Sequence, residues 1–232
     1  DTLIIEGGEA TTHPDLIHLI QYARRIGMNE IMMETNARML TYRDFSKKLA
    51  KSGLTMLFMT VHGPNAQVHD GQTRTPGSFE QTHNGVRTML ETGYNNVSLN
   101  IPVHRQLLKG DNLYDTYALY AGLGIKRFMI QQLTPAGAYA GDMSQVASYA
   151  EIIPKIRDLI ERASPEHDIK LMNIPLCFMD DLEEYAHADM NNIGAFNSDD
   201  AEHDIVEMLA AGKNKDSACH TCEWGFLCTG FV

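Results

Sequence analysis

Leu3-Ile4-Ile5-Glu6-Gly7-Gly8-Glu9 is the stretch of sequence that decides the fold. A short apolar run of β-forming residues leads directly into two glycines and a carboxylate. A helical pattern then opens at Pro14, carries an apolar stripe with i, i+3, i+4 spacing and stops at Gly27. A strand, a glycine loop and a helix in this order indicate a βα unit of a parallel sheet.

The same unit recurs along the chain, where short runs of β-formers alternate with helical periods. The predicted strands cover residues 3–6, 30–35, 55–61, 96–102, 127–132 and 169–174. Helices are predicted at 78–93, about 112–122 and 144–163. Ser78-x-x-Gln81 predicts a capping box for the first, and Pro154 is expected to kink or split the last. The sequence therefore predicts an α/β fold.

Composition limits the class of protein. The chain has 232 residues with 44% hydrophobic content, which suffices for one domain and a small appendage. Its formal net charge is -11, and no Lys/Arg run occurs, so a nucleic-acid partner is not expected. No apolar run is long enough to span a membrane. We expect a soluble, cytoplasmic protein without a membrane partner, in which the 13 methionines, Met32, Met33, Met56 and Met59 among them, fill the core.

Polar and glycine residues follow most of the predicted strands, as in Gly7-Gly8-Glu9, Asn36-Ala37-Arg38, His62-Gly63-Pro64 and the run at 134–137. Because βα loops converge at the carboxyl ends of parallel strands, we expect ligands there. Two residues without side chains let a ligand approach the backbone, and the Glu9 carboxylate beside them suits an ammonium group. A tight turn without any ligand is the alternative explanation of the two glycines.

The order of these motifs is informative. Gly7-Gly8-Glu9-Ala10 is followed by His13-Pro14-Asp15, Thr35-Asn36-Ala37-Arg38, Thr60-Val61-His62-Gly63-Pro64, His69-Asp70, Arg74 and Pro76-Gly77-Ser78-Phe79. This succession closely resembles the radical S-adenosylmethionine (radical SAM) superfamily over roughly residues 1–137. The resemblance implies a partial (β/α)6 TIM-like barrel of parallel strands, from which the first strand and helix are absent here.

The resemblance also implies which residues bind S-adenosylmethionine. The glycine-glycine-glutamate motif binds the amino group of the methionyl end, and a Thr-Asn-Gly motif, with Ala37 in place of glycine here, ends the next strand. Members of the family often have a hydroxyl residue at the position of Thr60 and a polar residue facing the ribose at the position of Asn100. Their adenine ring meets the strand and loop that correspond to the region near Gln132. The cofactor-binding residues implied are Gly7, Gly8, Glu9, Thr35, Asn36, Thr60, Asn100, Gln132 and Leu133.

An acid-base or metal-binding role is one interpretation of His62, His69 and Asp70. Histidines scattered in loops are mostly solvated or hydrogen-bonded, however, and the resemblance supports a role in shaping the loop. A further expected feature is missing: the family holds its first [4Fe-4S] cluster with a CxxxCxxC loop, and no cysteine precedes Cys177. We expect that an N-terminal piece with this loop is missing, and a natural cluster-free relative is the other explanation.

Three of the four cysteines lie near the C-terminus. Cys219-x-x-Cys222 and Cys228 have the spacing of a metal loop, and Cys177 follows the last predicted strand. The four thiols allow a [4Fe-4S] cluster, a structural zinc or two disulfides. Resemblance to SPASM or twitch extensions favours an auxiliary [4Fe-4S] cluster. We therefore expect a radical SAM partial barrel at 1–175 and a small cysteine-rich extension at 176–232, with one helix containing Ile205, Met208 and Leu209.

The function implied is reductive cleavage of S-adenosylmethionine to a 5′-deoxyadenosyl radical, which abstracts hydrogen from a substrate. A ribosomal peptide or protein is the first expectation for the substrate, a small molecule the second, and the electron donor would be a flavodoxin or ferredoxin. Without the first cluster, the chain alone is expected to be inactive. The alternatives are an inactive binding or scaffold protein of the same fold, and a TIM-barrel protein with a structural zinc.

Overall fold

The structure is a computed structural model that describes residues 1–133, 143–186, 194–196, 202–204, 214–223, 225, 228 and 230. Six described strands form one parallel sheet in the order β1-β2-β3-β4-β5-β6. They are β1 (Thr2–Ile5), β2 (Glu30–Thr35), β3 (Met56–Thr60), β4 (Val97–Val103), β5 (Arg127–Gln132) and β6 (Asp168–Met172). All six predicted strands, and their parallel arrangement, are confirmed.

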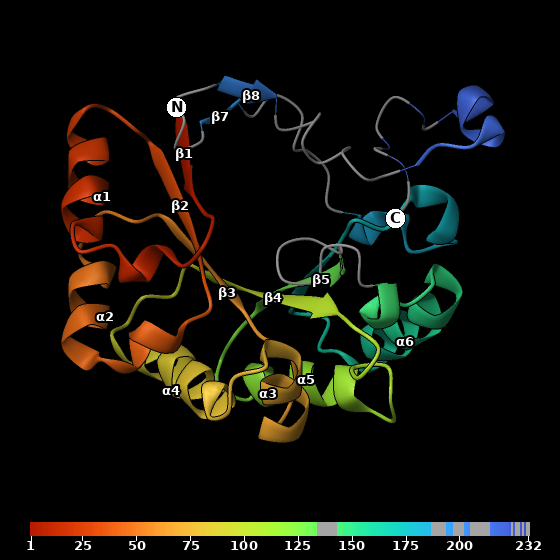
Figure 1. The fold of residues 1–232 in the computed structure, drawn as a ribbon, viewed down its shortest axis with the longest axis horizontal. Coiled ribbons are helices and arrows are strands. Elements are labelled where there is room, and N and C mark those ends of the chain that lie inside the picture. The colour runs from red at the N-terminus through yellow and green to blue at the C-terminus, as the bar shows by residue number, and fades with distance from the viewer. Residues whose placement is uncertain are drawn as a thin grey trace.

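The helices cover one side of this sheet. They are α1 (Leu16–Arg25), α2 (Arg43–Ala50), α3 (Ala66–Thr73), α4 (Ser78–Glu91), α5 (Asn112–Ala121) and α6 (Tyr149–Arg162). Figure 1 shows the sheet curving from β1 to β6 with the helices on its convex side. The hydrophobic core lies between these two layers. The opposite, concave side of the sheet carries no described helix.

Residues alternate between the two sides of the strands. In β2, Ile31 and Met33 are fully buried against the helices, whereas Glu34 is exposed on the concave side. In β3, Met59 is fully buried and Met56 is half-buried. The prediction that the methionines fill the core therefore holds for Met33 and Met59, while Met56 stands on the concave side. Every residue of β4 is buried, as expected of a central strand.

One detail of the helix prediction is wrong: no capping box forms at Ser78, because Gly77 is the N-cap of α4 and no side chain of the helix start makes a capping hydrogen bond there. Of the two outcomes expected at Pro154, a kink or a split, the split does not occur, since α6 runs through Pro154. The break comes earlier, where a 3-10 helix (Met143–Gln145) precedes α6. A capping box does form at α6, between Ser148 and Glu151.

Helices α2 and α3 were not predicted. Each has eight residues. In α3 two of the three buried side chains, His69 and Gln72, are polar, so its apolar stripe is weak. In α2, Phe45 and Leu49 stand one helical turn apart and pack on the core, a signal that the prediction overlooked. Further 3-10 helices cover Ala10–Thr12, Arg38–Thr41, Leu176–Phe178, Glu183–Tyr185 and Ser217–Thr221.

Beyond β6, the described residues include an antiparallel pair, β7 (Gly194–Phe196) and β8 (Glu202–Asp204), which the sequence did not predict. The helix predicted around Ile205, Met208 and Leu209 lies outside the described residues. The division at residue 175 remains a prediction. No helix in the described part of the chain combines the length and apolar character needed to cross a membrane.

Candidate functional site

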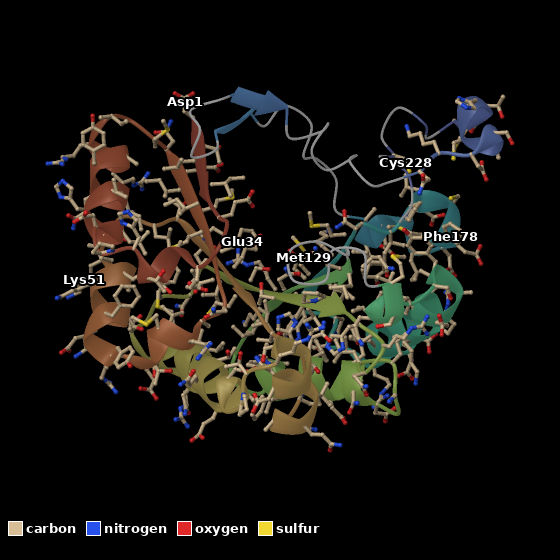
Figure 2. All side chains as sticks on the ribbon, in the orientation of Figure 1. Asp1, Glu34, Lys51, Met129, Phe178 and Cys228 are labelled. Carbon is tan, nitrogen blue, oxygen red and sulfur yellow. The ribbon has the colours of Figure 1, made fainter. Side chains whose placement is uncertain are left out.

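The site predicted from sequence lies where neighbouring strands end. Register pairs Thr60 of β3 with Asn100 of β4, and Asn100 with Met129 of β5. Paired residues of a parallel sheet project to the same side. In Figure 2 the side chains of Glu34 and Met129 point into the space inside the curved sheet, so Thr60 and Asn100 belong to this concave side.

Gly7 and Gly8 form the turn after β1. Their φ angles are 81° and 48°, a backbone conformation that favours glycine. A side chain built on either residue would meet no atom within 4 Å, so the surrounding space is open. The turn thus explains the glycines without any ligand, and the open space is also compatible with close approach of one.

Glu9 joins the ends of β1 and β2. Its Oε1 accepts hydrogen bonds from the Thr11 amide at 3.2 Å, the Thr11 hydroxyl at 2.5 Å and the Thr35 hydroxyl at 2.6 Å. Its Oε2 accepts one from the Asn36 amide at 2.8 Å. The carboxylate is therefore fixed by four donors, while Oε2 retains capacity for a further donor.

The turn after β2 is held by its own side chains. The Asn36 side-chain oxygen accepts from the Arg38 amide at 3.0 Å, and the Thr35 hydroxyl accepts from the Ala37 amide at 3.1 Å. Ala37 has a φ of 62°, which explains why the resembled family places glycine there. Both Thr35 and Asn36 thus act on Glu9 and on the turn in this structure.

Of the remaining predicted cofactor contacts, Asn100 carries a side-chain oxygen that is buried without a partner among the described residues. A bound water or ligand is the expected partner of such an atom. Gln132 points to the helical side, where its side-chain amide donates to the Ala147 carbonyl at 2.9 Å. Leu133 directly follows β5 and is half-buried. The predicted loop at 134–137 lies outside the described residues.

Asp70 shapes the loop between α3 and α4, as predicted. Its Oδ2 accepts from the Gly77 amide at 2.7 Å, and its Oδ1 accepts from the Phe79 amide at 2.7 Å and the Ser78 hydroxyl at 2.9 Å. These donors, the Phe79 amide first, lower the pKa of the Asp70 carboxyl. Asp70 therefore caps α4 from the preceding helix.

Two residues of the site were missed. Thr11 is 3% exposed, and both its amide and its hydroxyl donate to Glu9. No spacing in the sequence predicts a side-chain contact of this kind. Glu34 stands on the concave side, and although more than a third of its surface is exposed, desolvation by the surrounding sheet first and Glu6 second raise the pKa of its carboxyl. A usable signal existed for Glu34, since a charged residue interrupts the apolar run at 31–33.

The four cysteines are all described, and each is a free thiol, so the two-disulfide alternative is not observed. Burial raises the pKa of the Cys177 thiol, and the thiols of Cys228, Cys222 and Cys219 raise it further. The Cys177 thiol is thus within electrostatic reach of the other three. Among the described residues, however, no group of three or more His, Cys, Asp or Glu side chains is arranged to hold a metal ion.

A family model described as the radical SAM superfamily matches residues 1–111. Residues 1–111 thus form a radical SAM domain. This chain is similar to an AdoMet-dependent heme synthase of Methanosarcina barkeri, with 30% identity over 149 residues, 64% of this chain and 41% of the relative. It is also similar to a probable GTP 3',8-cyclase of Saccharolobus islandicus, with 24% identity over 133 residues, 57% of this chain and 42% of the relative.

The chain spans about two fifths of the length of these curated relatives. Among solved structures, Streptococcus suis SuiB bound to S-adenosylmethionine matches 100% of this chain and 61% of its own, with a TM-score of 0.64 and 13% identity. SuiB bound to its precursor peptide SuiA matches with a TM-score of 0.66 and 14% identity. This likeness concerns the fold, and it confirms the predicted partial barrel.

Proposed function

We propose that this chain is the S-adenosylmethionine-binding part of a radical SAM enzyme. One observation supports it above the others: the Glu9 carboxylate is fixed between the ends of two parallel strands, beside an open glycine turn. A fixed carboxylate binds an ammonium group by a charge-assisted hydrogen bond without having to be ordered first. The residues present therefore fit the methionyl end of the cofactor.

The chain's own residues bind and orient in this proposal. Glu9 holds the ammonium, Gly7 and Gly8 allow backbone contact, and Thr60 and Asn100 offer polar groups on the concave side. Thr35 and Asn36 hold Glu9 in place. When bound together with a reduced [4Fe-4S] cluster, S-adenosylmethionine supplies a 5′-deoxyadenosyl radical for hydrogen abstraction, leaving methionine.

The cluster has no ligand set here, because the 232 residues contain no CxxxCxxC motif. It would have to be held by cysteines outside them. The test compares this chain with the full-length protein after anaerobic reconstitution and reduction by dithionite. We expect the full-length protein to release 5′-deoxyadenosine and this chain to release none. Release by this chain, or binding of S-adenosylmethionine without cleavage by the full-length protein, would contradict the proposal, and the second result would favour the scaffold alternative.

Two substrate classes, a peptide and a small molecule, each have support from the comparisons. A peptide is supported by the SuiB complex with SuiA, which shares the fold. A small molecule is supported by the two curated relatives, whose names are heme synthase and GTP cyclase and whose sequence identity is higher. A flavodoxin or ferredoxin in the cytoplasm would supply the electron, as in the expectation from sequence.

We also propose that Cys177, Cys219, Cys222 and Cys228 hold an auxiliary [4Fe-4S] cluster of the SPASM or twitch type. The support is the metal-loop spacing and the electrostatic reach of the three C-terminal thiols to Cys177. The described arrangement does not itself form a metal site, so the segment would have to close around the cluster.

The auxiliary cluster is tested by analysing this chain after anaerobic purification. Four thiolates suit either an iron-sulfur cluster or zinc. We expect about four irons and four sulfides per chain with broad brown absorbance, and loss of both in Cys222→Ala. One zinc without sulfide would replace the cluster by a structural zinc site. Retention of the full iron content in Cys177→Ala would remove that residue from the ligand set.

A further inference from the structure

Four histidines gather at the carboxyl ends of β3 and β4, and the proposed function does not use them. The His62 ring lies 5.4 Å from that of His69 and 6.3 Å from that of His104, measured between centroids. His69 continues to Phe79 at 5.9 Å, and Phe79 stacks on His83 at 5.8 Å. Histidines from α3, α4 and the end of β4 thus surround the loop after β3.

Two of these histidines hold the backbone of the third. The His62 amide donates to Nδ1 of His69 at 3.2 Å, and the His62 carbonyl lies 2.9 Å from Nε2 of His104. Because a carbonyl only accepts, His104 must carry a proton on Nε2, and His69 must leave Nδ1 unprotonated. His69 is 1% exposed and His104 is fully buried, so both contacts are shielded from water.

The side of the sheet on which His62 lies follows from the alternation along β3. The Val61 amide donates to the Asn100 carbonyl at 3.0 Å, which extends the β3–β4 pairing one residue past β3. Val61 is fully buried on the helical side, and His62 is half-buried. Strand alternation therefore places His62 on the side of Thr60, closer to the carboxyl edge where ligands bind.

The protonation of His62 is also determined. Burial first, and then His69 and His104, lower its pKa to about 3, so the imidazole is neutral near pH 7. Its Nδ1 is buried without a partner among the described residues. A buried N–H without an acceptor is unfavourable, so the single ring proton belongs on Nε2. A neutral, immobilised N–H donor thus stands beside Thr60.

We propose that His62 is a further cofactor contact, whose Nε2–H donates a hydrogen bond to an oxygen of S-adenosylmethionine. This inference rests on the proposed function and names a residue for the same site. The cofactor offers two classes of oxygen acceptor, the ribose hydroxyls and the methionyl carboxylate. Neither requires a charged imidazole, which agrees with a ring that stays neutral.

The experiment measures S-adenosylmethionine binding by the cluster-loaded, full-length protein using anaerobic calorimetry. His62→Phe keeps a flat ring and removes the donor, and we expect about a three- to tenfold loss of affinity. His62→Gln places an amide N–H about where Nε2 stands and should restore most of it. His83→Phe is the matched control, since His83 also has a buried, unpartnered Nδ1 but lies behind Phe79 on α4. It should leave the affinity unchanged.

Fragments separate the two classes of oxygen. 5′-Methylthioadenosine carries the ribose without the carboxylate, and methionine carries the carboxylate without the ribose. Loss of affinity for the first in His62→Phe assigns the ribose, and loss for the second assigns the carboxylate. Unchanged affinity for both and for S-adenosylmethionine overturns the inference, as does a failure of His62→Gln to restore binding.

A measurement without substitution covers the case of a variant that does not fold. In the unsubstituted protein with ¹⁵N-labelled histidine, addition of S-adenosylmethionine should shift the His62 Nε2 resonance, and an unshifted resonance overturns the inference. Absence of any binding by the unsubstituted protein would instead overturn the proposed function. If Glu9→Gln weakens binding and His62→Phe does not, only the role of His62 fails.

Discussion

Glu9 stands at the junction of two strand ends, and its carboxylate has two tasks in the proposed site. It carries the charge for an ammonium group, and it accepts four hydrogen bonds that tie the β1 turn to the β2 turn. The sequence predicted the residue and its charge. It could not predict the donors, because Thr35 is 26 residues away and meets Glu9 only through the pairing of β1 with β2.

Glu9→Gln should weaken S-adenosylmethionine binding by the full-length protein by about one to two decades. A charge-assisted hydrogen bond contributes roughly 1.5–3 kcal/mol, and the neutral amide loses this charge. Calorimetry measures the affinity, and Glu6→Gln is the matched control, exposed three residues earlier. Equal affinity of the Glu9→Gln and unsubstituted proteins would remove the main support for the cofactor assignment.

Gly85 of α4 lies against the turn that positions Asn36. A Cβ on Gly85 would stand 1.9 Å from the Ala37 carbonyl oxygen, so the helix or the turn would have to move. We expect Gly85→Ala to lower the free energy of unfolding by about 2 kcal/mol, as overpacking does, and to weaken cofactor binding through Glu9.

Urea unfolding of this chain measures the effect of Gly85→Ala. The matched control is Gly71→Ala in α3, where a Cβ meets nothing within 4 Å. That variant should be more stable by about 0.5–1 kcal/mol, because alanine is the better helix former. Gly85→Ala as stable as Gly71→Ala would contradict the close approach of α4 to the turn.

At the scale of elements, Asp70 of α3 caps the start of α4. The sequence predicted α4 with good bounds, because its apolar face is regular, but it assigned the cap to Ser78 and missed α3. Local pattern shows a cap within a few residues of a helix start. It does not show a carboxylate of the preceding helix that accepts from the first amides of the next one, as Asp70 does.

Asp70→Ala should lower the free energy of unfolding by about 1 kcal/mol, the typical effect of losing a helix cap. The cap also predicts a pH dependence: the folded pKa of Asp70 is lowered, so its contribution is present above the unfolded value of about 3.9 and is lost as pH falls below it. Urea unfolding between pH 6 and pH 3 measures both. Gln81→Ala, which a Ser78 capping box would make important, should change stability by less than about 0.5 kcal/mol.

For the whole molecule, the six-stranded sheet followed from sequence because apolar strands and helical segments alternate regularly up to residue 172. The described elements after β6 are short strands and 3-10 helices. Elements this short do not repeat a hydrophobic period often enough for it to be recognised in the sequence. The sequence also did not predict which residues meet on the concave side. Alternation separates these residues from the core, but the curvature that brings them together comes from the pairing of all six strands.

The buried histidines should make the whole chain sensitive to acid. Burial is the largest cause that lowers the pKa of His62 to about 3 and that of His69 to about 4, whereas unfolded histidine titrates near about 6.5. Below that value the unfolded chain binds more protons, so stability falls as pH decreases from about 6.5 towards 4. The expected slope is on the order of 1 kcal/mol per pH unit for each histidine.

Urea unfolding at a series of pH values measures this slope. His69→Asn removes one of the two groups while retaining an acceptor for the His62 amide, so it should flatten the profile. His18→Asn, at an exposed position of α1, is the control and should leave the slope as it is. A flat profile in the unsubstituted chain would show that these rings are protonated in the folded state.

The alternation along β2 and β3 has a consequence for how the protein can change over generations. The core positions of these strands are Ile31, Met33, Leu57 and Met59. Their neighbours on the concave side are Met32, Glu34 and Phe58. In a library of all single substitutions, we expect changes at every second position of these strands, those on the concave side, to leave the cellular abundance of the protein unchanged. Substitutions can therefore accumulate at one set of positions while the other set keeps the fold intact.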